Sequence, residues 1–264
     1  MERDTGEEGA MNRNAPIGMF DSGVGGISVL REAVRQLPRE RFIFFGDTKN
    51  APYGTKTKEE VLALSRRVVE TLLDKGCKAI VIACNTATSA AAATLRAEYA
   101  DLPIIAMEPA LKPASQLHQD GIVLSLATPG TIAGEKYAHL YALYGEGVVS
   151  LPCKGLMEFA ERGELDSPAL HDYLQGVFQP YKQKKVEAVV LGCTHYVFLK
   201  KAIQRFFPDT PLIDGNAGTV RQLARRLEEK DLLARRDAEG GVELLSSGGP
   251  EAVKQMEVLL KMES

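Results

Sequence analysis

The 264-residue sequence has few cysteines, no long apolar run and no excess of charge of one sign. Its four cysteines, Cys77, Cys84, Cys153 and Cys193, form neither a CxxC pair nor another zinc-ligand spacing, and a disulfide framework is not expected at this chain length. No stretch reaches the roughly 20 apolar residues of a membrane span, and no secretory signal is recognisable. The net charge is −3, and no basic stripe indicates a nucleic-acid surface. We therefore expect a cytoplasmic protein with reduced thiols and with no metal site, nucleic-acid partner or membrane contact.

Short β-branched apolar runs alternate with segments of helical periodicity along most of the chain. The strand candidates are 17–20, 42–45, 79–83, 103–107, 121–127, 147–151, 187–192, 211–213 and 242–246. The helix candidates are 26–36, 57–75, 86–99, 131–143, 154–163, 168–184, 197–206, 217–233 and 250–262. Such alternation predicts an α/β fold with mostly parallel sheets that are flanked by helices.

One short motif occurs twice, as AIVIACNT at 79–86 and as AVVLGCTH at 188–195. Each copy reads as a buried strand that ends at a cysteine, and open α/β sheets bind ligands at the carboxyl ends of their strands. We therefore predict two similar α/β lobes with the active site in the cleft between them. The first lobe would comprise 15–107 plus 216–264 and the second 108–215, while the polar residues 1–14 would form a loose tail.

Two thiols that face each other across a cleft suit a reaction served from opposite faces of one carbon, as racemisation is. A free thiol has a pKa of about 8.5, so each cysteine needs help to act as a base, and a following helix N-terminus would favour the thiolate. His195 could exchange a proton with Cys193, and Asp21 stands at the end of another strand. Cys77 and Cys153 read as small buried hydrophobes.

Two further segments allow two interpretations each. The glycine-rich segment 17–28 is either a tight strand-to-helix turn or a phosphate loop; it lacks the Walker lysine, and Ser28 replaces the third glycine of a dinucleotide fingerprint. The loop 44–54 is either a plain connection or a substrate contact through Tyr53 and Gly54. Glu161, from its pattern alone, is a solvated helix glutamate.

Five blocks in one order carry a family resemblance: FDSGVGG at 20–26, FFGDTKNAPYG at 44–54, IACNTAT at 82–88, LGCTHY at 191–196 and IDGNAG at 213–218. Together they resemble the glutamate racemases, cofactor-independent enzymes that supply D-glutamate for bacterial peptidoglycan. The resemblance implies a two-lobed α/β fold with the site between the lobes, no cofactor, L- and D-glutamate as substrates, and a homodimer.

The resemblance also implies roles for individual residues. Cys84 would deprotonate D-glutamate with the help of Asp21, and Cys193 would deprotonate L-glutamate with the help of His195; Glu161 would be a third assisting residue. Lys154 stands where the family usually has proline, and Gly134 departs from the family's Thr-Ile-x-Ser pattern. The implied substrate contacts are Asp21, Ser22, Tyr53, Gly54, Asn85, Thr86, Thr128, Thr131, Thr194 and His195.

Other functions remain open at this level. An aspartate or hydantoin racemase would share most of these blocks, and a substrate panel separates them. A nucleotide- or phosphate-binding module would use segment 20–28 and would tolerate Cys84→Ser. A catalytically inert binding protein would bind glutamate without exchanging its Cα proton.

Overall fold

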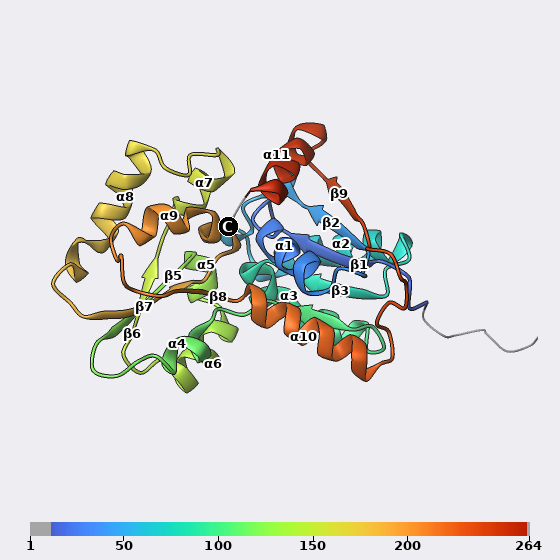
Figure 1. Ribbon diagram of the computed structural model, residues 1–264, viewed down its shortest axis with the longest axis horizontal. Helices are drawn as coiled ribbons and strands as arrows, with labels where there is room; N and C mark the ends of the chain where they lie inside the picture. Colours follow the sequence, from blue (N-terminus) through green and yellow to red (C-terminus); the bar gives the residue numbers. More distant parts are fainter. Residues whose placement is uncertain (1–11, 263–264) are drawn as a thin grey trace, which may run out of the picture.

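The structure of the protein, a computed structural model, describes residues 12–262, so most of the predicted N-terminal tail lies outside the described residues. Its strands form two separate sheets, which occupy the two halves of the molecule (Figure 1). The first sheet has the strand order β4-β3-β1-β2-β9. Its strands are β1 (Ile17–Asp21), β2 (Phe42–Gly46), β3 (Ala79–Ile82), β4 (Ile104–Ala106) and β9 (Val242–Ser246).

The second sheet has the order β6-β5-β7-β8. Its strands are β5 (Ile122–Ala127), β6 (Val148–Pro152), β7 (Val186–Leu191) and β8 (Leu212–Asp214). All the strand pairs in both sheets are parallel. The predicted α/β architecture with two parallel sheets is therefore confirmed. The lobe boundaries at 107/108 and 215/216 stay a prediction.

Eleven α-helices lie within the described residues. They are α1 (Ile27–Gln36), α2 (Lys58–Asp74), α3 (Asn85–Glu98), α4 (Leu111–Ser115), α5 (Pro129–Ile132), α6 (Glu135–Tyr144), α7 (Leu156–Glu161), α8 (Pro168–Phe178), α9 (Lys200–Gln204), α10 (Asn216–Glu229) and α11 (Pro250–Lys261). Four short 3-10 helices accompany them: η1 (Thr48–Asn50), η2 (Tyr53–Thr55), η3 (Gln179–Tyr181) and η4 (Thr194–Leu199).

Two predicted helices differ from the structure in ways that affect the site. The helix predicted at 131–143 is divided into α5 and α6, because Gly134 has an extended backbone and begins the second helix. The helix predicted at 197–206 begins earlier, as η4, directly after Cys193. The short helices α4, η1 and η2 were not predicted, since they have too few turns to show a period.

Local sequence explains where the longer helices begin. Thr57 accepts a hydrogen bond from the Glu60 amide, and the Glu60 side chain accepts one from the Thr57 amide, which completes a capping box at the start of α2. Ser167 caps α8 through the amide of Leu170, with Pro168 as the first helical residue. Both caps satisfy backbone donors that no helical carbonyl can reach.

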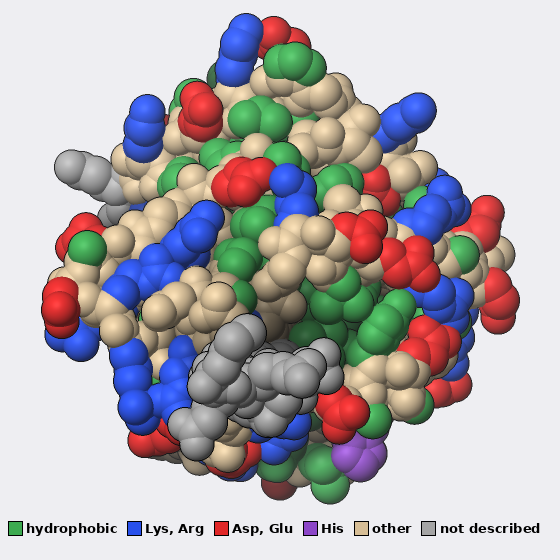
Figure 2. All heavy atoms as spheres, turned by 90° about the vertical axis from the view of Figure 1, so that its right-hand side faces the viewer, with side chains coloured by type: hydrophobic (Ala, Val, Ile, Leu, Met, Phe, Trp, Pro, Cys, Tyr) green, Lys and Arg blue, Asp and Glu red, His purple; other side chains and the backbone are tan. Residues whose placement is uncertain are grey.

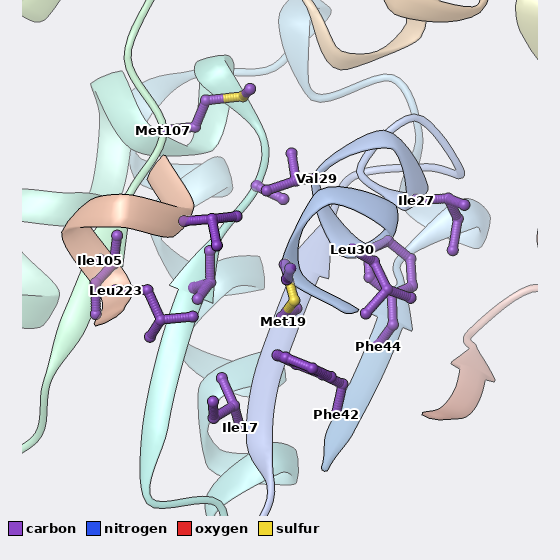
Figure 3. Packing of buried hydrophobic residues seen from close by; sticks show 14 of the residues in the cluster. Ile17, Met19, Ile27, Val29, Leu30, Phe42, Phe44, Ile105, Met107 and Leu223 are labelled. Carbon is purple, nitrogen blue, oxygen red and sulfur yellow. The ribbon is translucent and has the colours of Figure 1, made fainter. Parts of the chain in front are cut away.

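Side chains of the first sheet alternate between two apolar cores. Phe42 and Phe44 of β2 pack with α1, α10 and α11 on one face, whereas Ile43 packs with α2 and α3 on the other. Figure 3 shows part of the first core, with Met19 and Phe44 of the sheet facing Leu30 of α1. Burial of each such apolar side chain stabilises the folded state by roughly 1.5–3 kcal/mol relative to an exposed side chain. The second sheet also has two apolar cores. Packing on both faces of each sheet fixes the positions of the residues at the strand ends.

The surface agrees with the balanced composition. Figure 2 shows one face of the molecule, on which basic and acidic side chains are interspersed. No helix between residues 12 and 262 is both long enough and apolar enough to cross a membrane.

Candidate active site

Cys84 follows β3 and is the N-cap of α3, as the repeated motif predicts. Its sulfur accepts a hydrogen bond from the amide of Ala87 at 3.4 Å and donates one to the Ser22 hydroxyl at 3.5 Å. Burial raises the pKa of the Cys84 thiol to about 12, and the negative charge of Asp21 adds to this rise. Cys193 is near enough to contribute in the same direction. Cys84 is therefore a neutral thiol at neutral pH.

Cys193 follows β7 and begins η4, so its partners differ from those of Cys84. Its sulfur lies 3.6 Å from Nδ1 of His195, and Nε2 of His195 lies 2.5 Å from the Glu161 carboxylate. Burial opposes a charged imidazole, but the bonds to Cys193 and Glu161 outweigh it and raise the pKa of His195 well above its ordinary value. The pKa of Glu161 is lowered, because the contact with His195 outweighs the effect of burial. Glu161 is therefore not the solvated helix residue that its sequence pattern indicates.

Asp21 connects the two cysteine units. One carboxylate oxygen accepts a hydrogen bond from the Gly23 amide at 2.8 Å, and the other accepts one from the Thr194 hydroxyl at 3.0 Å. The Ser28 hydroxyl adds a second bridge by donating to the Thr194 carbonyl at 3.2 Å. The carboxyl end of β1 is therefore bonded to the loop that carries Cys193.

The glycines after Asp21 make room for the second half of the site. A Cβ atom on Gly23 would lie less than 3.0 Å from the Glu161 carboxylate, and one on Gly25 would lie less than 3.0 Å from His195 and Thr194. The space next to this turn is thus occupied by side chains of the protein. This arrangement favours the close-packing turn over the phosphate loop.

Tyr53, the predicted contact in loop 44–54, is fully buried and donates a hydrogen bond to Asp47 at 2.6 Å. Burial raises the pKa of Tyr53 well above its ordinary value, and the hydrogen bond to Asp47 and the negative charge of that carboxylate add to this rise. Asn50 donates to both oxygens of the same Asp47 carboxylate. The sequence analysis did not single out Asp47, although it directly follows strand β2, in the same relation to its sheet that other site residues have.

Three of the predicted threonines meet in one cluster. Thr128 and Thr131 are 2.9 Å apart through their hydroxyl oxygens, and Thr86 lies 3.4 Å from each of them. Gly54 faces this cluster. Thr86 comes from α3, Thr131 from α5 and Thr128 from the N-cap of α5, so the cluster joins the halves of the molecule at a second place.

Asn85 follows Cys84 and donates from its amide nitrogen to the sulfur of Met107 at 3.5 Å. Its Oδ1 atom is buried and has no hydrogen-bond partner within the described part of the chain. A buried oxygen in this condition is costly, and a ligand that donates a hydrogen bond relieves the cost.

Both thiols are almost completely shielded: Cys84 is 6% exposed and Cys193 is 8% exposed. A pocket of about 280 Å³ is lined by Tyr53, Gly54 and Thr86, the last of which follows Cys84 by two residues, and by Gly130 and Gly134. Lys58 and Glu135 form an ion pair across this pocket at 3.5 Å.

Within residues 12–262, no group of three or more His, Cys, Asp or Glu side chains is arranged to hold a metal ion. Every predicted site residue is buried or partly buried. One hydrogen-bonded group contains Cys84, Ser22, Asp21, Thr194, His195, Cys193 and Glu161. The geometry offers two proton-transfer units, each centred on a thiol, which Asp21 and Thr194 connect.

Known proteins are similar to this chain in sequence and in fold. Residues 17–223 match the model of the Asp/Glu/Hydantoin racemase family. A glutamate racemase of Clostridium botulinum is 49% identical over 247 residues, which cover 92% of this chain and 96% of the relative. Among solved structures, a glutamate racemase isoform of Bacillus anthracis superposes with a TM-score of 0.85 at 30% identity and covers 96% of both chains. A glutamate racemase of Francisella tularensis in complex with D-glutamate superposes with a TM-score of 0.81 at 29% identity and covers 95% of both. The chain therefore belongs to the Asp/Glu/Hydantoin racemase family of isomerases, and the glutamate racemases are the members that it resembles in both sequence and fold.

Proposed function

We propose that this protein interconverts L- and D-glutamate without a cofactor, using Cys84 and Cys193 as bases on opposite faces of the Cα carbon. The observation that carries the proposal is the pair of strand-end thiols, each of which contacts its own proton-handling side chains. Enantiomers have equal free energies, so the enzyme needs only to lower the barrier between them. One thiol removes the Cα proton as the other delivers a proton to the opposite face.

In the L-to-D direction, Cys193 would be the base and Cys84 the acid. Deprotonation of the Cys193 thiol requires a proton acceptor, and His195 is in contact with the Cys193 sulfur and can take this role. Glu161 would hold the imidazole in position and stabilise its positive charge. Cys84, whose pKa is raised to about 12, is already protonated and is suited to donate.

In the D-to-L direction, Cys84 must lose its proton. Asp21 and Ser22 are the nearest acceptors, since the Cys84 thiol contacts the Ser22 hydroxyl, and Ser22 lies beside Asp21. The substrate ammonium would offset the negative charge of Asp21, which otherwise raises the pKa of Cys84. Substrate binding would thereby activate the thiol that burial and the charge of Asp21 otherwise keep neutral.

The substrate would be held mainly by neutral donors. The backbone amides at the start of α3 and the hydroxyls of Thr86, Thr128 and Thr131 can donate hydrogen bonds to carboxylates. Tyr53, Gly54 and Thr194 complete the predicted contacts. The unpartnered Oδ1 of Asn85 would accept a hydrogen bond from the ammonium group.

Glutamate is the favoured substrate because the Clostridium relative is a glutamate racemase and the Francisella protein binds D-glutamate. The alternative of an aspartate or hydantoin racemase would keep both thiols and change the substrate. The nucleotide-binding alternative is disfavoured, because the space beside Gly23 and Gly25 is filled by Glu161 and His195. The family resemblance further supports supply of D-glutamate for peptidoglycan, a cytoplasmic location and a homodimer, which remain predictions.

The decisive experiment incubates the purified, reduced protein with L-glutamate in deuterated buffer without added cofactor. Circular dichroism should fall toward zero, and proton NMR should show deuterium at Cα of the product. Turnover of aspartate or a hydantoin in place of glutamate would move the protein to a sister activity. Binding of glutamate without any Cα exchange would contradict the enzymatic proposal.

A further inference from the structure

The C-terminal helix α11 contacts the site through one side chain. α11 packs against α1 and β9, which belong to the half of the molecule that contains the first sheet. From this helix, Nε2 of the partly buried Gln255 donates a hydrogen bond to the backbone carbonyl of Glu161. Glu161 ends α7, whose core residues pack with the second sheet. Figure 1 shows α11 beside α7 at the boundary between the two halves.

The end of α7 explains why this outside donor is needed. Carbonyls in the last turn of a helix lack intrahelical partners. Here the amides of Arg162, Gly163 and Glu164 satisfy the carbonyls of Glu158, Ala160 and Phe159 in turn. The Glu161 carbonyl is satisfied by Gln255 instead.

The side chain of Glu161 is held from two other directions. One of its carboxylate oxygens accepts a hydrogen bond from the Val24 amide at 3.4 Å and contacts Nε2 of His195 at 2.5 Å. His195 in turn contacts the Cys193 sulfur. The contacts therefore run without interruption from α11 through Glu161 and His195 to Cys193.

We propose that Gln255 is a positioning residue for the Cys193 half of the reaction: by holding the end of α7, it keeps the Glu161 carboxylate against His195. The inference rests on the proposed function, because it concerns proton transfer by Cys193. Cys84 is held instead by Ala87 and Ser22. The effect should therefore fall on one half of the reaction.

Half-reactions provide a selective test. In a Cys84→Ala background, only Cys193 remains to exchange the Cα proton of L-glutamate; in a Cys193→Ala background, only Cys84 remains to exchange that of D-glutamate. Gln255→Met keeps the volume and removes the donor. We expect it to slow L-glutamate exchange by about five- to tenfold, the size of one lost hydrogen bond, and to leave D-glutamate exchange unchanged.

Two variants control for general damage. Lys254→Ala alters the neighbouring residue, which forms only an exposed ion pair with Glu251, and should change neither exchange rate. Gln255→Lys keeps a donor on a flexible chain and should restore most of the L-glutamate exchange. Equal slowing of both half-reactions by Gln255→Met, or slowing of neither, would overturn the inference.

A second measurement is independent of turnover. NMR titration of His195, assigned by comparison with His195→Asn, reports the imidazole pKa directly. The titratable groups around this ring are Cys193, Glu161 and, through Thr194, Asp21. Gln255→Met should lower the pKa of His195, because a displaced Glu161 stabilises the imidazolium less, and an unchanged pKa contradicts the inference. Failure of the wild type to racemise glutamate would remove the proposed function, while this titration would still decide whether Gln255 positions Glu161.

Discussion

Cys84 and Cys193 both follow buried parallel strands, but the first begins a 14-residue α-helix and the second begins a 3-10 helix of 6 residues. Beside Cys84 are a carboxylate and a hydroxyl, from Asp21 and Ser22. Beside Cys193 is an imidazole backed by a carboxylate. The repeated motif therefore places two equivalent thiols, while side chains from other segments give each thiol a different proton-transfer partner. Similar strand ends need not have similar acid–base chemistry.

Removal of either thiol should have the largest effect. Cys84→Ala and Cys193→Ala should each lower racemisation by at least about 10³-fold, because each leaves one face of Cα without a proton donor or acceptor. Polarimetry measures this loss, and NMR in deuterated buffer should still show slow exchange with L-glutamate for Cys84→Ala and with D-glutamate for Cys193→Ala. Near-normal racemisation by either variant would refute the two-thiol scheme.

The partners of the thiols should be next in importance. Asp21→Asn and His195→Asn should each lower kcat/KM by about 10²-fold, the lower end of general acid–base contributions. Because the two enantiomers have equal free energies, kcat/KM must fall equally in both directions. The difference between the halves should appear with Cα-deuterated substrates: His195→Asn should increase the isotope effect for L-glutamate and Asp21→Asn that for D-glutamate.

The effect of Asp21 on the Cys84 thiol can be measured by titration of that thiol. The pKa of Cys84 is raised to about 12 by burial and by Asp21, so Asp21→Asn should lower it by removing a nearby negative charge. Ultraviolet absorbance of the thiolate measures this in a variant whose other three cysteines are replaced by alanine. A pKa that stays the same or rises in Asp21→Asn would show that Asp21 does not act on Cys84.

Contact between the halves can be tested at the glycine-rich turn. A Cβ on Gly25 would press against His195 and Thr194, so Gly25→Ala should displace them and lower kcat/KM by about tenfold or more. Gly176→Ala is the matched control, because a Cβ at this position of α8 meets nothing within 4 Å. Gly176→Ala should retain full activity with equal or greater stability. A fully active Gly25→Ala would show that the halves need not pack this closely.

The smallest expected effect is a difference in the free energy of unfolding between two tyrosine variants. Tyr53 and Tyr196 are both fully buried, but Tyr53 donates to the Asp47 carboxylate and Tyr196 donates to the neutral carbonyl of Cys153 at 3.1 Å. Tyr53→Phe should lower the free energy of unfolding by about 2 kcal/mol and Tyr196→Phe by about 1 kcal/mol, since hydrogen bonds to charged groups are stronger. Urea denaturation measures both, and the reverse order would contradict this account of Asp47.

Much of the fold could be predicted because the chain follows local rules. All nine strands of residues 12–262 occur where the apolar runs predict them, with ends that differ by at most one residue. Thr57 and Ser167 form helix caps of the kind that threonine and serine favour. The divided helix at Gly134 and the early start of η4 were not predicted, because packing decides them more than periodicity does. Gln255 was missed for a related reason, since its partner Glu161 is 94 residues away in the sequence. Asp47 was missed although its partners Asn50 and Tyr53 belong to the same loop.

The sequence by itself determined the two strand–cysteine units and the α/β order of elements, since a buried strand and its end are defined by neighbouring residues. It also carried the ordered motifs from which the family was predicted. Only the tertiary structure decided which side chains meet. It joined Asp21 to Thr194, brought Glu161 from an apparently solvated helix onto His195, and filled the glycine-rich turn with protein atoms. Such contacts depend on how two sheets and the helices between them pack, which no local pattern encodes.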